Sequence, residues 1–327
     1  MAAVHTEQGD VSPTPSSPQQ IERMSPREMH YYLTEGLEGV EHEGYRDIRS
    51  VKRAVDSRVN MVRSGKADEC GTPYLVFCPV TQKQLANIER VRDARYKILR
   101  FLYLNEPQTL IIKILPGPIY DMLVDEFVHA LRKKIDEKGQ GKKICSMRST
   151  TYKGLACSKE ADGALRPKVA RPDINDWPSV ILECGVAESP RRLAADARWW
   201  FRNSGGAVKM VILFLVSIAT KTMRIETWEQ EKVENPRFTP GNDDNEVDPP
   251  MVQETTTLSE GKITNPLKIH FEAIFLRAPS KKRGEEDYTL TEGDLRNYYE
   301  RVWKEIESSP EPEDCKSSLV RPCLNSI

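Results

Sequence analysis

The sequence lacks the features that mark disulfide-rich, zinc-binding and membrane-spanning proteins. None of its seven cysteines forms a CxxC pair, and their odd number and wide spacing favour reduced thiols over a disulfide framework. Its five histidines are scattered without metal-ligand spacing. The longest apolar run, residues 210–219, is half the ~20 residues that a bilayer core requires, and the amino-terminal end lacks the basic start and apolar segment of a signal peptide. We therefore expect a soluble, intracellular protein, cytoplasmic or nuclear, with no membrane partner.

An excess of one charge is also absent, because 48 basic residues nearly cancel 49 acidic ones. The charges are nevertheless unevenly distributed along the 327 residues. Residues 130–148 hold seven basic and two acidic residues, whereas residues 229–260 hold nine acidic and two basic ones. Clustered cations suit phosphate contacts, so the basic segment 130–148 predicts contact with nucleic acid.

Composition and helix-capping signals divide the chain into segments. Residues 1–24, rich in proline and serine, and residues 309–327 are expected to be disordered tails. Residues 25–105 form a helical N-terminal region with three helices: one capped by Ser25, one that follows Asp47, and one that runs from Thr81 through Leu99. Residues 106–228 form an α/β core, residues 229–262 an acidic loop, and residues 263–308 a strand and a helix that complete the core.

The core segment predicts alternating strands and helices. The apolar run 109–115 predicts a strand, and the apolar stripe 119–135 a helix. Three strands are expected at 150–153, 161–165 and 180–184. A helix that starts at Ser189 and a buried strand at 208–219 should follow them. An edge strand at 222–228, a strand at 267–277 and a helix capped by Thr291 are expected to end the fold. These expected elements include the order αβββαβ.

Two acidic residues fall on neighbouring strands of this core. Asp162 lies on the second core strand and Glu183 on the third. Carboxylate oxygens on neighbouring strands can bind Mg²⁺, which activates water and neutralises a scissile phosphate. For Asp162, the alternative is a turn carboxylate, since Asp-Gly often marks a turn. Glu183 is flanked by apolar residues and is costly to bury without a partner or a metal.

These residues resemble a known superfamily. The sequence resembles the PD-(D/E)XK nuclease-like superfamily, and it is also similar to a group of uncharacterised fungal proteins assigned to that superfamily. The resemblance is carried by Asp162, by the stretch 178–185 that contains Glu183, and by the helix with Trp199 and Trp200. The resemblance covers roughly residues 107–305. It implies a restriction-endonuclease-like αβββαβ core with a mixed central sheet flanked by helices, and a magnesium site formed by Asp162 and Glu183 with Glu126 as a third acid.

The lysine that completes the superfamily motif is missing. Its position is occupied by Gly185, and the helix after it offers only arginines. Arginine stabilises phosphate charge but is a poor base because it stays protonated. The candidate catalytic residues are therefore Asp162, Glu183, Arg198 as the phosphate-stabilising residue, and Lys153 as a substitute lysine.

Three functional hypotheses follow. The first is a magnesium-dependent nuclease that hydrolyses phosphodiesters of nucleic acid. The second is a catalytically inactive module of the same fold that binds nucleic acid or protein, which the absence of the motif lysine favours. The third is an effector or toxin-like component, supported by the basic helices before residue 105.

Overall fold

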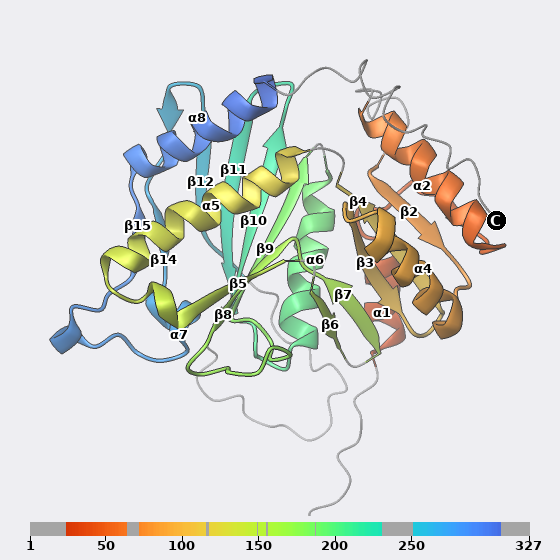
Figure 1. The fold of residues 1–327 in the computed structure, drawn as a ribbon, viewed down its shortest axis with the longest axis horizontal. Helices are drawn as coiled ribbons and strands as arrows, with labels where there is room; N and C mark the ends of the chain where they lie inside the picture. Colours follow the sequence, from red (N-terminus) through yellow and green to blue (C-terminus); the bar gives the residue numbers. More distant parts are fainter. Residues whose placement is uncertain are drawn as a thin grey trace, which may run out of the picture.

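The computed structural model describes residues 24–63, 72–115, 118–148, 150–154, 156–186, 188–230 and 251–308. The expected tails lie outside these residues, apart from Met24, and so does most of the expected acidic loop. The described chain forms two large sheets with a helix between them, and a small two-stranded sheet (Figure 1). We call the seven-stranded sheet the core sheet and the six-stranded one the N-terminal sheet.

The core sheet follows the order β13-β12-β11-β10-β9-β8-β5. Its strands are β5 (Ile144–Met147), β8 (Gly163–Pro167), β9 (Val180–Val186), β10 (Met210–Ser217), β11 (Thr222–Glu229), β12 (Met251–Ser259) and β13 (Lys262–Ile263). Only β9 and β10 pair in parallel, joined by helix α6 (Pro190–Asn203). The remaining pairs are antiparallel.

The N-terminal sheet follows the order β1-β2-β4-β3-β7-β6. Its strands are β1 (His42–Glu43), β2 (Tyr74–Phe77), β3 (Leu99–Leu104), β4 (Thr109–Ile114), β6 (Thr151–Lys153) and β7 (Cys157–Glu160). Strands β6 and β7 follow β5 and precede β8 in the chain but lie outside the core sheet. Strand β7 pairs with β3, and β6 pairs with β7 at the edge. A separate two-stranded pair joins β14 (Leu267–Ile269) to β15 (Tyr288–Leu290).

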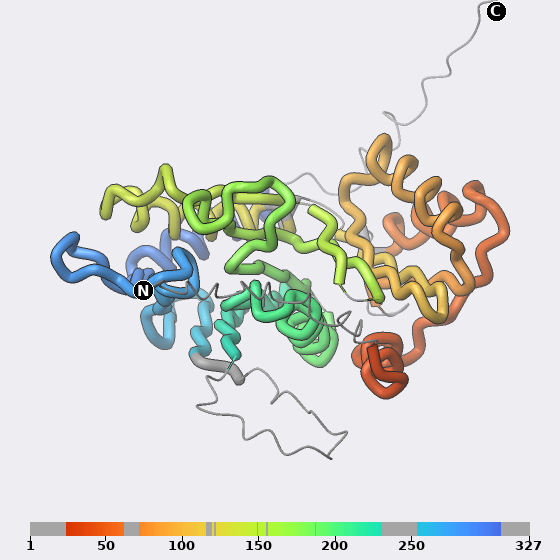
Figure 2. Tube along the Cα trace, turned by 90° about the horizontal axis from the view of Figure 1, so that it is seen from below, coloured from red at the N-terminus to blue at the C-terminus, as the bar shows by residue number. Residues whose placement is uncertain are grey.

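Helices cover both sheets in layers (Figures 1 and 2). Helices α5 (Pro118–Glu137) and α8 (Glu292–Ser308) pack on one face of the core sheet. Helix α6 packs on its other face and also against the N-terminal sheet, with α1 (Pro26–Thr34) beside it. Helices α2 (Ile48–Arg63) and α4 (Gln82–Arg95) cover the outer face of the N-terminal sheet. Helix α6 is therefore enclosed between two sheets.

The expected helix starts are confirmed by their caps. Ser25 accepts a hydrogen bond from the Glu28 amide, and Thr81 forms a reciprocal capping box with Gln84. These side chains satisfy amides that the first helical turn leaves without partners. Asp47 likewise accepts a bond from the Ser50 amide at the start of α2.

The element order confirms the expected fold class. Elements α5, β5, β8, β9, α6 and β10 reproduce the order αβββαβ in a mixed sheet flanked by helices. One strand assignment was wrong. The first core strand is β5, whereas residues 151–153 form β6 in the N-terminal sheet. The two short strands are only a few residues apart, so composition alone could not assign them to different sheets.

The expected helical region at 25–105 contains the three expected helices and, in addition, strands β1, β2 and β3. Helix α4 ends at Arg95, and Leu99 begins β3 instead of extending the helix. Every residue of β2 and β3 is buried. A strand buried on both faces shows no polar alternation, so a short one is easily mistaken for part of a helix.

The C-terminal part differs from expectation in three places. Strand β12 and the short β13 occupy part of the expected acidic loop at 229–262. Because β12 pairs with β11, the expected edge strand 222–228 lies inside the sheet. The expected strand 267–277 is the short β14 followed by helix α7 (Phe271–Phe275). None of the helices in the described part of the chain is long and apolar enough to cross a membrane.

Candidate functional site

Asp162 and Glu183 lie close together on the side of the core sheet that faces α6. Asp162 precedes β8 and accepts a hydrogen bond of 2.9 Å from the Cys184 amide of β9. Glu183 accepts a bond of 2.7 Å from the indole Nε1 of Trp200 on α6. The two residues are 3% and 1% exposed. Neighbouring strands thus bring the predicted pair together, but in the interior of the protein.

Two lysines neutralise this pair. Lys113 of β4 places its Nζ 3.1 Å from Asp162 Oδ2 and 3.7 Å from Glu183 Oε2. Lys159 of β7 places its Nζ 3.4 Å from Glu183 Oε1. Each lysine is 4% exposed. Both belong to the N-terminal sheet, so the contacts that neutralise the acids also join the two sheets.

Other buried charges extend this group. Glu188 lies 3.4 Å from Lys113 and accepts a hydrogen bond from the Tyr74 hydroxyl. Asp196 of α6 lies 3.1 Å from Lys159 and 3.3 Å from Arg192. We call the following eight residues the inter-sheet charge cluster: Arg100, Lys113, Lys159, Asp162, Glu183, Glu188, Arg192 and Asp196. Four are basic and four acidic, so their formal charges cancel.

The pKa values of the two predicted acids shift in opposite directions. Burial alone would raise the pKa of Asp162, but Lys113, Arg100 and the Cys184 amide outweigh it and bring this pKa to about 2. For Glu183, burial dominates over the attraction of Lys159 and raises the pKa to about 8. Asp162 therefore stays ionised, whereas Glu183 retains its proton near neutral pH.

The raised pKa of Glu183 predicts a pH-dependent stability. In the unfolded chain, Glu183 loses its proton near the ordinary pKa of 4.5, whereas in the folded protein it keeps the proton up to about pH 8. Between these values the folded state binds more protons, so the free energy of unfolding falls as pH rises. We expect the wild-type protein to lose up to about 1.4 kcal/mol per pH unit more than Glu183→Gln over this range.

Urea denaturation at a series of pH values measures this difference in slope. Asp294→Asn is the control. Burial alone would raise the pKa of this acid of α8, but Lys134 and Thr291 lower it below the ordinary value of 3.8, and it lies outside the inter-sheet charge cluster. Parallel curves for the wild type and Glu183→Gln would show that Glu183 is ionised throughout.

A metal ion does not fit this arrangement. No three His, Cys, Asp or Glu side chains of the described residues converge in a way that could hold one. The oxygens of Asp162 and Glu183 instead face the ammonium groups of Lys113 and Lys159. We therefore derive no catalytic step through magnesium for this conformation.

The other predicted site residues lie elsewhere. Glu126 of α5 pairs with Arg301 of α8, at 3.2 Å, on the far side of the core sheet. Lys153 is exposed on β6. Arg198 donates a hydrogen bond of 2.9 Å to the Tyr31 hydroxyl and stacks over its ring. The described structure brings none of the three to the Asp162–Glu183 pair.

Gly185 could not carry the motif lysine in this fold. A Cβ atom at Gly185 would lie 2.8 Å from Glu188 Cβ and 2.8 Å from Leu193 Cδ1, so even the first side-chain carbon has no room. The cations come instead from Lys113 and Lys159, which the sequence pattern did not predict as site residues. Lys113 did leave a signal, since it is the one charged residue in the buried strand TLIIKI, and a buried lysine demands a partner.

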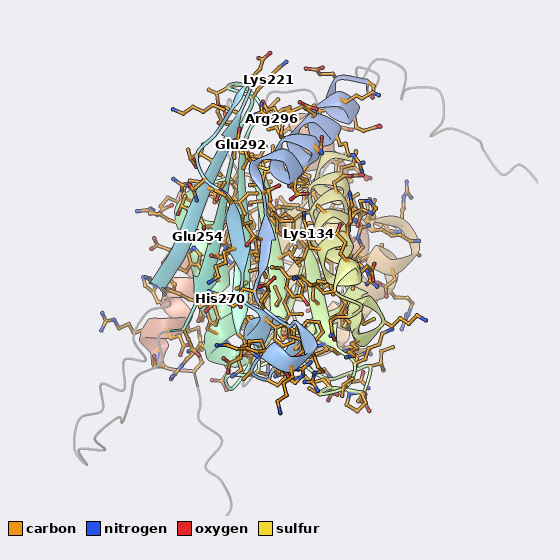
Figure 3. All side chains as sticks on the ribbon, turned by 90° about the vertical axis from the view of Figure 1, so that its left-hand side faces the viewer. Lys134, Lys221, Glu254, His270, Glu292 and Arg296 are labelled. Atoms are coloured by element: carbon orange, nitrogen blue, oxygen red, sulfur yellow. The ribbon has the colours of Figure 1, made fainter. Side chains whose placement is uncertain are left out.

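Three of the seven basic residues in segment 130–148 pair with acidic residues. Lys134 lies 2.8 Å from Asp294, and Lys138 pairs with Glu286. Arg148 pairs with Asp125. This face of α5 and α8 mixes both charges: Glu292 and Arg296 lie together on α8, and Lys134 lies below them on α5 (Figure 3). Contact with nucleic acid through 130–148 remains a prediction, and among its described residues Lys133, Lys142 and Lys143 form no ion pair with an acid.

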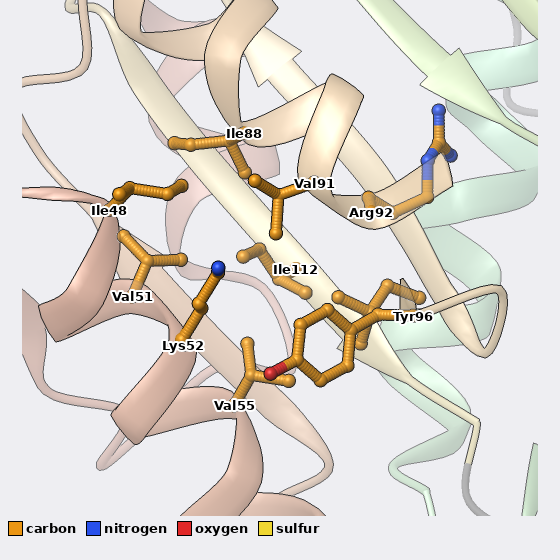
Figure 4. Close-up of a pocket in the computed structure, with 10 residues that line it drawn as sticks. Ile48, Val51, Lys52, Val55, Ile88, Val91, Arg92, Tyr96 and Ile112 are labelled. Carbon is orange, nitrogen blue, oxygen red and sulfur yellow. The ribbon is translucent and has the colours of Figure 1, made fainter. Parts of the chain in front are cut away.

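A second basic surface lies on the outer helices. Its exposed cations are Arg49 and Arg53 of α2 and Lys83, Arg90 and Arg95 of α4. No acidic side chain that the structure describes forms an ion pair with any of these five. An apolar pocket between the two helices opens beside Lys52 (Figure 4). We call these five residues the α2–α4 basic surface.

Comparisons with known proteins add little to this description. No protein-family model matches the chain, and no curated protein matches its sequence. Among solved structures, the chain is similar to a protein of the DUF820 group from Anabaena variabilis whose name calls it a "putative nuclease". The two chains are 12% identical, with a TM-score of 0.30, and the likeness covers 42% of this chain and 81% of that one. At this level of similarity, the function has to be inferred from the site itself.

Proposed function

We propose that the protein is a nuclease-fold module that binds nucleic acid without hydrolysing it. The observation that carries this proposal is the position of the Lys113 ammonium. It contacts the carboxylates of Asp162, Glu183 and Glu188 inside the protein. Acids that are neutralised by an internal lysine are not free to hold a catalytic metal.

Burial of the pair supports the same conclusion. A scissile phosphate must come within a few ångströms of the groups that act on it. Asp162 and Glu183 are at most 3% exposed and lie between the two sheets. Hydrolysis would require the N-terminal sheet to separate from the core sheet, which would break the contacts of Lys113 and Lys159 together.

The α2–α4 basic surface supports the binding half of the proposal. Its five cations project from two helices on the same face of the N-terminal sheet. Exposed cations that form no ion pair with a described acidic side chain can contact phosphates and release the counterions that surround nucleic acid. The apolar pocket between the helices, lined by Val51, Val55 and Ile88 among others, lies within this surface.

Fluorescence anisotropy with labelled single-stranded DNA, duplex DNA and RNA tests this proposal. We expect binding that weakens steeply with salt and no cleavage in Mg²⁺ or Mn²⁺. The double variant Lys83→Glu/Arg90→Glu should weaken binding by at least about tenfold and flatten the salt dependence. Lys133→Glu/Lys142→Glu makes the same charge change on segment 130–148 and should leave affinity almost unchanged.

Two outcomes would contradict the proposal. Absence of salt-sensitive binding to all three nucleic acids would remove its binding half. Cleavage that requires Mg²⁺ or Mn²⁺ and disappears in both Asp162→Asn and Glu183→Gln would restore the nuclease hypothesis. A greater effect of Lys133→Glu/Lys142→Glu would move the binding surface to segment 130–148.

A further inference from the structure

A small cavity lies between helix α6 and the face of the N-terminal sheet that α6 covers. Its volume of about 10 Å³ is close to the smallest that holds one water-sized ligand. We call it the cation-lined cavity. The following polar side chains line it: Tyr74 of β2, Arg100 of β3, Lys113 of β4, Lys159 of β7, and Arg192 and Asp196 of α6.

Charges of the inter-sheet charge cluster are distributed unevenly around this cavity. The formal charges of the whole cluster cancel, but all four of its cations line the cavity, whereas Asp196 is the one acid of the cluster that does. The other three acids, Asp162, Glu183 and Glu188, contact these cations without belonging to the lining. The cavity therefore lies in a locally positive environment, which favours an anion.

Strand pairing adds to this positive field. Arg100 and Lys113 are direct partners across the antiparallel strands β3 and β4, and like charges in this position repel each other. They are 6% and 4% exposed, so solvent ions screen the repulsion poorly. Asp162 contacts both, at 3.5 and 3.1 Å, but supplies one negative charge for two positive ones.

Two guanidinium groups of the lining also have a hydrogen-bond donor to spare. The Nε–H groups of Arg100 and Arg192 are buried and have no hydrogen-bond acceptor among the described residues. A buried donor without an acceptor is costly. A water molecule in the cavity would accept from them but would bring two further donors of its own. A ligand that accepts hydrogen bonds and donates none matches this lining better.

We infer that the cation-lined cavity binds one halide ion, chloride in the cell, between the N-terminal sheet and α6. The ion accepts the hydrogen bonds of Arg100 and Arg192 and supplies the negative charge that the lining lacks. It also reduces the repulsion between Arg100 and Lys113. Because these side chains come from β3, β4 and α6, the bound ion joins the N-terminal sheet to the helix that packs on the core sheet.

This inference goes beyond nucleic-acid binding and does not depend on it. The cavity lies inside the protein, whereas the proposed binding surface lies on the outer side of α2 and α4. Failure of the halide experiment would therefore leave the binding proposal standing, and the reverse also holds.

Thermal unfolding at constant ionic strength tests the inference. Chloride is increased while gluconate, which is too large for the cavity, is decreased. The Tm of the wild type should rise by about 2–4 °C for each tenfold increase in chloride above its Kd, because a ligand that binds only the folded state stabilises it. A Tm that does not change with chloride would overturn the inference.

Two arginine variants show whether the effect comes from the cavity. Arg100→Met should lose the rise in Tm with chloride, since it removes one cation and one donor of the lining. Arg166→Met is the matched control: Arg166 is also 6% exposed and also has a buried Nε without an acceptor, but it lies outside the lining. It should keep the full rise. An equal rise in both variants would assign the effect to general salt stabilisation and contradict the inference.

Bromide locates the ion even if Arg100→Met does not fold. Anomalous scattering from wild-type crystals soaked in NaBr should show one bromide in the cavity, in contact with Arg100 and Arg192. A water molecule in the cavity, with bromide bound only elsewhere, would overturn the inference. So would bromide in the cavity together with a Tm that ignores chloride, because this would be binding at crystal concentration only.

Discussion

Replacement of Trp200 by alanine should lower the free energy of unfolding by about 3–5 kcal/mol, the range seen when a buried tryptophan is truncated. Trp200 is fully buried on α6. It donates the 2.7 Å hydrogen bond to Glu183, and its ring lies 5.7 Å from the Lys159 ammonium. The substitution therefore removes packing between the two sheets and one partner of a buried acid at the same time. Urea denaturation measures the loss.

Phenylalanine variants separate the two contributions. Trp200→Phe keeps most of the ring volume but loses the bond to Glu183, which is worth about 0.5–1.5 kcal/mol because Glu183 is protonated near neutral pH. Trp199→Phe is the matched control, because its indole bonds to no carboxylate that the structure describes. Equal losses in the two variants would mean that the bond to Glu183 contributes nothing to stability.

Arg192→Met should destabilise the protein by about 3–5 kcal/mol, because it breaks a buried ion pair, leaves Asp196 with Lys159 alone among the described cations, and removes the buried hydrogen bonds of the guanidinium. The Arg192 guanidinium lies 3.3 Å from Asp196 and donates a 2.8 Å hydrogen bond to the carbonyl oxygen of Tyr32 at the end of α1. It also lies over the ring of Tyr74 in β2. One side chain thus holds α1, α6 and the N-terminal sheet together. Methionine keeps the stem of the side chain but makes none of the polar contacts.

The preceding residue provides the control for this prediction. The side chain of Arg191 is 61% exposed and pairs with acidic residues at the surface. Exposed ion pairs contribute little, so Arg191→Met should change the free energy of unfolding by less than about 1 kcal/mol. If the two neighbouring variants were equally stable in urea, the inter-sheet charge cluster would not hold the sheets together.

Features encoded by neighbouring residues could be predicted from the sequence. The caps at Ser25 and Thr81 depend on residues three positions away, and both are found as expected. The αβββαβ order also follows from runs of apolar residues with short breaks between them. By contrast, β2 is only four residues long and buried throughout, so no local pattern separated it from the helices around it.

The candidate site could be predicted only in part, because its cations come from distant positions in the chain. Asp162 and Glu183 share one sheet and were paired correctly by their strand positions. Lys113 reaches Asp162 across 49 positions of sequence, through a contact between two sheets. The sequence pattern alone did not indicate that the second sheet existed, so its lysines could not be assigned to the acids.

The position of β6 and β7 in the N-terminal sheet restricts the order in which the chain can fold. Strand β3 pairs on one side with β4 and on the other with β7, which follows it by more than fifty residues. During synthesis, the edge of β3 stays without its partner until residue 160 has left the ribosome. Strand β3 is buried in the folded protein, but before β7 is made one of its edges has no partner. An unpaired strand edge is a template for association with other chains. The N-terminal sheet therefore cannot be separated as an autonomous folding unit, and a nascent chain reaches its most aggregation-prone stage between the synthesis of β4 and that of β7.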